Sequence, residues 1–386
     1  MKWGFAVIFL SLFLSFTVNL TNATTWYVHP DSSLNSIQEA LDSCSNDDTV
    51  LVAPGIYNEN IVWHNNIQGI HLKSECGPSI TIIDGSGSSV LPVVCITILA
   101  DTTTIIDGFC IRNGSSSFGG GGIYSESGSP TIINNIITSN TASIYGGGVY
   151  CSVGSPIIVR NTITGNSSEN GGGIYCAGGT PIIKFNSIAG NSAVSGAGIY
   201  CISSSPNIDS CIVSNNTGNG IYCCYSSNPT INFCNIIDNF TYGILNKDST
   251  VIINAEYNWW GDPTGPFHPD SNPGGQGDTV SNWVDFIPWL TGPIGIKEEG
   301  QDQRHKATDL RLICHPNPFT TSTTIHFSSI ERRAEGIELT VYDASGRLVK
   351  SIPLSTNNLS LGTDLSPGIY FLKTDGKYVG KVVKVR

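Results

Sequence analysis

The chain has 386 residues, with 30 acidic and 19 basic side chains and a formal net charge of −11. This negative charge argues against nucleic-acid binding, because proteins that bind a phosphate backbone neutralise it with Lys and Arg. Only 13% of the residues are charged, while 43 are glycine. The composition therefore favours a protein of turns and packed strands over one of helices with charged faces.

Residues 1–23 are predicted to be a secretory signal peptide. Lys2 is the charged start, the apolar core runs from Ala6 to Val18, and Thr21–Ala23 forms a small-residue cleavage site. The core is shorter than the roughly 20 residues of a membrane-spanning helix, and no other apolar run reaches that length. We expect an exported protein that is not an integral membrane protein.

The segment that follows predicts one short helix and then strands. Asn35–Asp42 has an amphipathic pattern, and Asn35 and Gln38 stand at the spacing of a capping box. Asp47–Ile61 is rich in β-branched residues and turn residues.

A Gly-Gly-Ile-Tyr motif then recurs along the chain at intervals of 22 to 26 residues. A fixed period in the range of 20 to 50 residues indicates a solenoid of stacked repeats. The apolar residue directly before the tyrosine position marks each repeat: Ile123, Val149, Ile174, Ile199, Ile221 and Ile244.

A second and a third marker keep the same phase. A proline follows each tyrosine by six or seven residues, and an asparagine follows each proline by ten: Asn140, Asn166, Asn191, Asn216 and Asn239, with Asn113 assigned to the same position one repeat earlier. The runs of Ile, Val and Thr between the markers predict strands, and none has helical spacing. We predict an all-β fold, a right-handed parallel β-helix, with the asparagines stacked into a ladder at a turn.

Alternation along a strand assigns the two faces of the Ile-Tyr-Cys segment. Ile174 and Cys176 are expected to point inward and Tyr175 outward. The equivalent cysteines, Cys151, Cys176, Cys201 and Cys223, would form an inner ladder. The exported state leaves two alternatives for the cysteines, buried thiols or disulfides, with Cys223–Cys224 and Cys211–Cys234 as the candidate bridges.

The helix, the first strands and the repeats together resemble right-handed β-helix proteins such as pectin methylesterases, over about residues 25–260. The resemblance implies the fold and leaves the activity open. We assign residues 24–295 to this domain. Its predicted C-terminal cap contains Trp259, Trp260, Trp283 and Trp289. The alternative for this segment is a sugar-stacking or calcium site using Asp262, Asp270 and Asp278; no other cofactor is expected.

Residues 296–310 are a charged linker, and residues 311–386 predict a small immunoglobulin-like β-sandwich. Its candidate strands are Thr323–Phe327, Glu338–Tyr342, Leu348–Ile352, Gly368–Thr374 and Lys377–Val385. Four motifs in this tail resemble the C-terminal sorting domain (type A) of substrates of the bacterial type IX secretion system: Pro316–Phe319, Val341–Arg347, Leu365–Tyr370 and Lys381–Arg386. The resemblance implies that this machinery routes the protein by its tail across the outer membrane to the cell surface or the medium, and that the tail is usually removed. Together with the predicted signal peptide, this gives export across the inner and outer membranes.

Few residues in the repeats fit catalysis. Lys184 is predicted to stack directly on Asp209, with Arg160 near them in phase, and this is the one outward charge cluster that the repeats assemble. A solvated ion pair is the alternative reading of Lys184 and Asp209. No histidine lies between residues 72 and 267, so the usual general base is missing from the central repeats.

The other candidate site is a stripe of tyrosines that the repeat stacks on the outer surface: Tyr124, Tyr150, Tyr175, Tyr200 and Tyr222. A tyrosine offers a sugar a flat apolar face and a hydroxyl, although its high strand propensity alone explains its recurrence. We expect a non-catalytic scaffold or adhesin-like protein that binds polysaccharide or cell-surface glycan. The alternative is a polysaccharide lyase, glycoside hydrolase or carbohydrate esterase.

Overall fold

The computed structural model describes residues 23–63, 67–88, 90–97, 100–294, 312–315, 320–327, 338–343, 347–353, 358–362, 364–374 and 377–385. The chain divides into two compact units, Met1–Ile296 and Lys297–Arg386. The predicted signal peptide, apart from Ala23, and the predicted linker lie outside the described residues.

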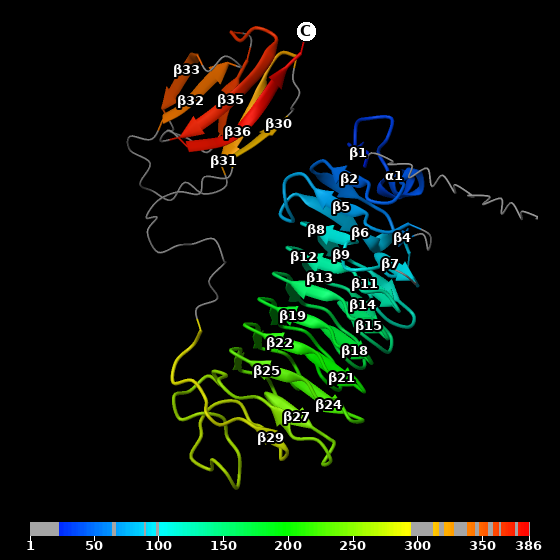
Figure 1. Cartoon of the computed structure of the whole chain (residues 1–386), viewed down its shortest axis with the longest axis vertical. Coiled ribbons are helices and arrows are strands. Elements are labelled where there is room, and N and C mark those ends of the chain that lie inside the picture. Colours follow the sequence, from blue (N-terminus) through cyan, green and yellow to red (C-terminus); the bar gives the residue numbers. More distant parts are fainter. Residues whose placement is uncertain are drawn as a thin grey trace, which may run out of the picture. The chain divides into compact units, whose positions relative to one another are not determined.

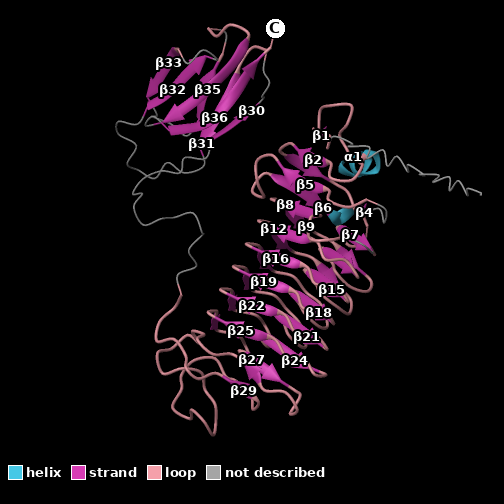
Figure 2. Ribbon diagram, viewed as in Figure 1, coloured by secondary structure: helices cyan, strands magenta, loops and turns pink. Residues whose placement is uncertain are grey.

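The first unit is a parallel β-helix whose coils stack along one axis (Figures 1 and 2). Three parallel sheets form its walls. Eight successive coils each contribute one strand to each sheet in the order A, B, C, and sheet A has three further strands at the ends of the stack. The eleven strands of sheet A are β1 (Thr25–Val28), β2 (Thr49–Val52), β5 (His71–Ser74), β8 (Ile105–Asp107), β12 (Thr131–Ile133), β16 (Ile157–Val159), β19 (Ile182–Lys184), β22 (Asn207–Asp209), β25 (Thr230–Asn232), β28 (Ile253–Asn254) and β29 (Val284–Asp285).

Sheets B and C have eight strands each. Sheet B contains β3 (Gly55–Tyr57), β6 (Thr81–Asp84), β9 (Cys110–Arg112), β13 (Ile136–Thr138), β17 (Thr162–Thr164), β20 (Ser187–Ala189), β23 (Ile212–Ser214) and β26 (Asn235–Ile237). Sheet C contains β4 (Ile61–Trp63), β7 (Val94–Thr97), β11 (Ile123–Glu126), β15 (Val149–Ser152), β18 (Ile174–Ala177), β21 (Ile199–Ile202), β24 (Ile221–Cys224) and β27 (Ile244–Asn246). A short pair, β10 (Ser115–Ser116) and β14 (Thr141–Ala142), lies between sheets B and C in sequence, and a 3₁₀ turn, η1, covers Gly85–Gly87.

The core of the β-helix consists of apolar side chains stacked in register. Ile174 and Cys176 are fully buried, and Ile174 pairs with Val149 and Ile199 in the neighbouring coils. The inner cysteine ladder is confirmed, because its four members pair in register and are at most 1% exposed. All eleven cysteines whose side chains the structure describes are free thiols.

Helix α1 (Ile37–Ser43) lies at the N-terminal end of the stack and buries Ile37, Ala40 and Leu41. The predicted capping residue, Asn35, is wrong by one position. Ser36 is the N-cap, and its hydroxyl accepts a hydrogen bond from the Glu39 amide at 3.2 Å. The Glu59 carboxylate, which the sequence does not reveal as a partner, accepts from the Ile37 and Gln38 amides at 2.9 Å.

Each coil has three corners, and at two of them a left-handed residue is followed by a residue that stacks in a ladder. The A–B corner joins sheet A to sheet B, and its left-handed residues have φ of 53° to 57°. They are Asn134, Arg160, Phe185, Ser210, Phe233 and Tyr257, followed by the ladder of Asn135, Asn161, Asn186, Cys211, Cys234 and Asn258.

The B–C corner follows sheet B and carries the ladder that the repeats predict. Its ladder positions hold Gly114, Asn140, Asn166, Asn191, Asn216 and Asn239. The prediction for Asn113 is wrong, since Gly114 occupies that position. Asn113 stands one residue earlier in the left-handed position, with φ of 59°, and its amide donates to Asp84 Oδ2 at 2.9 Å.

The second unit contains two antiparallel sheets, compatible with a small β-sandwich. One sheet is formed by β30 (Leu312–His315), β31 (Thr323–Phe327) and β34 (Asn358–Leu361), and the other by β33 (Leu348–Pro353), β32 (Glu338–Asp343), β35 (Gly368–Thr374) and β36 (Lys377–Lys384). The five predicted strands are confirmed to within one residue at their ends, whereas β30 and β34 were not predicted. Ile325, Leu339, Val341 and Leu372 are fully buried.

Candidate functional site

The predicted tyrosines form a continuous ladder on sheet C, where each pairs in register with the next. Their rings stack nearly parallel, with centroid distances of 4.8, 5.4, 5.1 and 4.8 Å and interplanar angles of 6° to 9°. The register follows from the repeat, so this part of the prediction is confirmed. The ring faces, however, contact one another and are therefore covered within the stack.

The middle of the tyrosine ladder is also covered from outside. Tyr150 and Tyr175 are only 6% and 5% exposed. Tyr145 lies 4.6 Å from Tyr175 between ring centroids, and Phe118 packs edge-on against Tyr150 at 5.9 Å. Burial accordingly raises the pKa of the Tyr175 hydroxyl. The repeat did not reveal this cover because Phe118 and Tyr145 precede the Gly-Gly-Ile-Tyr motif and do not recur in every coil.

The predicted pair of Lys184 and Asp209 is formed at neighbouring positions of β19 and β22. Lys184 Nζ lies 3.1 Å from Asp209 Oδ2, and both side chains are about 30% exposed. Such an exposed ion pair contributes little to stability, of the order of 0 to 1 kcal/mol. Arg160 stands at the A–B corner, where its guanidinium carbon lies 5.6 Å from the centroid of the Phe185 ring.

The A–B corner presents a group of aromatic side chains that the sequence analysis did not identify. Phe185 is partly exposed, and Phe233 and Tyr257 are 46% and 42% exposed. The rings of Phe233 and Tyr257 stack at 5.7 Å. A signal was present in the sequence: each of these residues directly precedes a ladder residue and keeps the same phase in the repeat.

Polar groups lie beside these rings on the outer face of sheet A. The Asn232 amide donates to Asn254 Oδ1 at 2.9 Å and to the Glu256 carbonyl at 2.8 Å. Asp209 Oδ1 accepts from the Ser210 hydroxyl at 2.7 Å. We call the group of Arg160, Lys184, Phe185, Asp209, Asn232, Phe233 and Tyr257 the corner surface.

The three aspartates considered for calcium have separate roles. Asp262 Oδ1 accepts from the Thr264 amide and hydroxyl at 2.9 and 2.6 Å. Asp278 Oδ2 accepts from the Asn239 amide nitrogen and side chain at 3.1 and 2.9 Å, so it ends the B–C ladder. Asp270 is exposed. Among the described residues no group of three or more His, Cys, Asp or Glu could hold a metal ion.

The four tryptophans of the predicted C-terminal cap differ in how deeply they are buried. Trp260 is fully buried in the core, Trp259 is 8% exposed, and Trp289 packs against the core cluster. Trp283 differs, since it is 49% exposed and has a left-handed backbone with φ of 65°.

Two families match the chain. The family of right-handed β-helix regions matches residues 94–256, and the family of secretion system C-terminal sorting domains matches residues 314–385. Neither the curated proteins nor the solved structures that were compared contain a match.

The described residues include no helix long and apolar enough to span a membrane. The two family matches divide the chain as its architecture does, with parallel sheets in the first unit and antiparallel sheets in the second. The chain is therefore a right-handed parallel β-helix repeat protein with a C-terminal sorting domain of the type IX secretion system, which makes it a secreted or cell-surface protein.

Proposed function

We propose that this protein is a non-catalytic scaffold that binds polysaccharide or cell-surface glycan after the type IX machinery has carried it across the outer membrane. The observation that supports this role most directly is the corner surface. Its exposed rings offer apolar faces for sugar rings, and the Lys184–Asp209 pair and Asn232 beside them offer hydrogen-bonding groups for hydroxyls.

The backbone at the corner strengthens this argument. Phe185, Phe233 and Tyr257 are held at φ of 55°, 53° and 57°. A bulky side chain is rarely found in this conformation, which costs about 1 to 2 kcal/mol for an L-residue. Strained residues cluster at binding and active sites. The fold places a left-handed residue at this corner in each of these coils, so the backbone alone is no sign of a site. Three of these positions hold exposed or partly exposed aromatic side chains where glycine or asparagine would be less strained, and this choice supports a binding role of the corner surface.

The tyrosine ladder stays a second prediction for the same function. Tyr124, Tyr200 and Tyr222 are partly exposed and could contact a glycan with their ring edges and hydroxyl groups. The hydroxyl of Tyr124 already donates to Glu126 Oε2 at 2.8 Å, and that of Tyr200 lies 3.3 Å from Cys224 Sγ.

Affinity electrophoresis of the mature chain through gels containing pectins, alginates, other glycans or mucins tests the proposal. A Phe185→Ser/Phe233→Ser/Tyr257→Ser variant should bind the retained glycan at least about tenfold more weakly, a loss of about 1.4 kcal/mol. Phe240→Ser is the matched control, because Phe240 is 82% exposed and lies outside the corner surface.

Three other outcomes would contradict parts of the proposal. Loss of retention only in a Tyr124→Ser/Tyr200→Ser/Tyr222→Ser variant would place binding on the tyrosine ladder. New reducing ends in any substrate would show an enzyme and make Lys184, Asp209 and Arg160 the first residues to replace. No retention of the native chain on any polymer would contradict glycan binding.

A further inference from the structure

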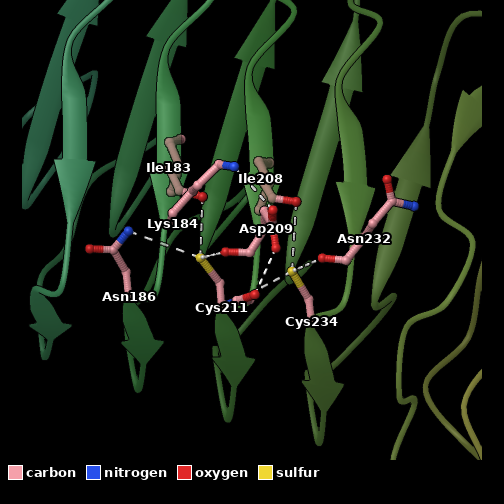
Figure 3. A network of polar contacts seen from close by, with 9 residues as sticks. Ile183, Lys184, Asn186, Ile208, Asp209, Cys211, Asn232 and Cys234 are labelled. Carbon is pink, nitrogen blue, oxygen red and sulfur yellow. Dashed lines mark hydrogen bonds and ion pairs between the residues drawn. The ribbon is translucent and has the colours of Figure 1, made fainter. Parts of the chain in front are cut away.

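The ladder of the A–B corner changes its chemistry in two successive coils. Asparagine occupies the ladder position at Asn135, Asn161 and Asn186 and again at Asn258, but Cys211 and Cys234 occupy it between them (Figure 3). Both cysteines are fully buried. They are free thiols in the structure.

The two thiols replace only some of the hydrogen bonds that asparagine makes at this position. An asparagine at this position uses two amide hydrogens and a carbonyl, as Asn161 does when it donates to the Ile132 carbonyl at 2.8 Å and accepts from the Asn135 amide at 2.9 Å. Cys211 Sγ lies 3.4 Å from the equivalent carbonyl of Ile183, and Cys234 Sγ lies 3.8 Å from that of Ile208. A thiol has one weak donor, so hydrogen bonding alone gives no advantage to cysteine at this position.

The positions of the two thiols favour a covalent bond between them. Ladder side chains lean toward the preceding coil, and Cys234 Sγ accordingly lies 3.4 Å from the Cys211 backbone nitrogen. Neighbouring coils are about 4.8 Å apart, within the roughly 4.4 to 6.8 Å between Cα atoms that a disulfide requires. Figure 3 shows the two sulfurs at equivalent positions of adjacent coils.

The inner cysteine ladder provides an internal comparison. Cys151, Cys176, Cys201 and Cys223 lie within paired strands of sheet C. Their coils have the same spacing of about 4.8 Å, so spacing alone does not separate them from the corner pair. The corner pair is distinguished by Cys234 Sγ, which lies 3.4 Å from the Cys211 backbone nitrogen. Cys211 and Cys234 lie outside the strands, directly before β23 and β26, where the corner backbone sets the side-chain direction.

We propose that Cys211 and Cys234 form a disulfide in the exported protein, which joins two successive coils beside the corner surface. Export takes the chain into an oxidising compartment. The oxidant is the disulfide of a thiol oxidoreductase. The Cys211 thiolate attacks it and forms a mixed disulfide, and the Cys234 thiolate then attacks the Cys211 sulfur. The S–S bond forms, and the oxidoreductase takes up the two electrons and the two thiol protons as a dithiol.

Burial determines when this reaction takes place. Burial raises the pKa of the Cys234 thiol, which disfavours the Cys234 thiolate of the second step once the coils have closed. The Cα spacing of the coils is already that of a disulfide, so the bond is expected to form while the last coils assemble and to be retained inside the folded corner.

Mass spectrometry of the full mature chain, purified after export, tests the proposal. Thiols are alkylated during unfolding without reductant, and the protein is then digested with trypsin and chymotrypsin. Chymotrypsin cleaves after Tyr222, Tyr225 and Phe233, which separates the two cysteines unless they are bonded. We expect one cross-linked peptide pair containing Cys211 and Cys234, about 2 Da lighter than the sum of its two thiol peptides, and alkylated Cys151 and Cys176.

The double variant Cys211→Asn/Cys234→Asn gives a second test. Asparagine occupies the same ladder position in the neighbouring coils, so this variant is expected to fold. Its melting temperature should not change on addition of reductant, whereas that of the native chain should fall. Complete alkylation of Cys211 and Cys234 in the exported native protein would overturn the proposal. A cross-link from either of them to Cys223 or Cys224 would overturn it as well.

Discussion

The A–B and B–C corners of the coil have the same backbone conformation but carry different side chains. Both place a left-handed residue before a ladder residue. At the B–C corner the left-handed position holds small or polar residues, such as Ser139, Gly165 and Gly190, and the ladder is continuous asparagine. At the A–B corner the same position holds Asn134 and Ser210 in two coils but Arg160, Phe185, Phe233 and Tyr257 in the others, and the ladder contains two cysteines.

The residue types at the left-handed positions show which side chains the fold favours there and which it merely accepts. The B–C corner uses residues that adopt a left-handed backbone at low cost. The A–B corner holds large exposed side chains there, although glycine or asparagine would be less strained. The fold thus requires the left-handed backbone at both corners, and it tolerates large exposed side chains at the A–B corner.

The largest effect is expected from breaking the continuous ladder. Asn166→Leu removes the acceptor of the Asn140 amide, 3.1 Å away, and the donor to the Ile137 carbonyl, 2.9 Å away, and both groups are buried. Each buried group without a partner costs about 1 to 3 kcal/mol. We expect the free energy of unfolding to fall by about 3 to 5 kcal/mol in urea denaturation. Asn207→Leu, at an exposed position of β22, should change it by less than about 0.5 kcal/mol.

A smaller effect is expected from the end of that ladder. Burial raises the pKa of Asp278 from 3.8 to about 6, against the hydrogen bonds from Asn239 that lower it. The folded protein thus binds this proton more tightly than the unfolded chain. The resulting stability is fully present below about pH 4 and is lost as the pH rises through 6, by about 3 kcal/mol.

Asp278→Asn tests this dependence without interrupting the ladder, because an amide oxygen can accept the same two hydrogen bonds. The variant should be more stable than the native chain at pH 8, and the difference should shrink toward pH 4. Denaturation curves that run parallel for both proteins from pH 4 to pH 8 would show that Asp278 does not titrate in this range.

The smallest effect on stability is expected at the A–B corner. Phe185→Gly removes the strain of the left-handed backbone, but it also removes the contact with Arg160 and increases the entropy of the unfolded chain. These terms oppose each other, so the free energy of unfolding should change by less than about 1 kcal/mol. Ser139→Gly is the matching change at the B–C corner. A loss above about 2 kcal/mol for Phe185→Gly alone would make this ring structural and weaken the case for the corner surface.

The repeat made much of this architecture predictable. Because equivalent residues stack, the spacing of Ile174, Tyr175 and Cys176 predicted both the register of sheet C and the inner cysteine ladder. The A–B ladder was missed because Cys211 and Cys234 interrupt its asparagines. Asn113 was assigned to the ladder position of its turn, but it stands one residue earlier, because Gly114 occupies the ladder position there. The cover over Tyr150 and Tyr175 comes from side chains outside the repeated motif, and periodicity carries no information about them.

The B–C ladder also gives the solenoid a direction. Along the ladder each side-chain oxygen accepts from the asparagine of the coil before, and each side-chain nitrogen donates to the ladder residue of the coil after as well as to a backbone carbonyl of the coil before. The chain of amide-to-amide bonds from Asn140 to Asn239 therefore runs in one direction and ends on the carboxylate of Asp278. A further coil inserted in the middle continues this run of bonds, whereas one added beyond Asp278 meets an acceptor where it needs a donor. Duplication of an internal repeat is thus the route by which such a protein can lengthen, and its final coil is the part that must stay last.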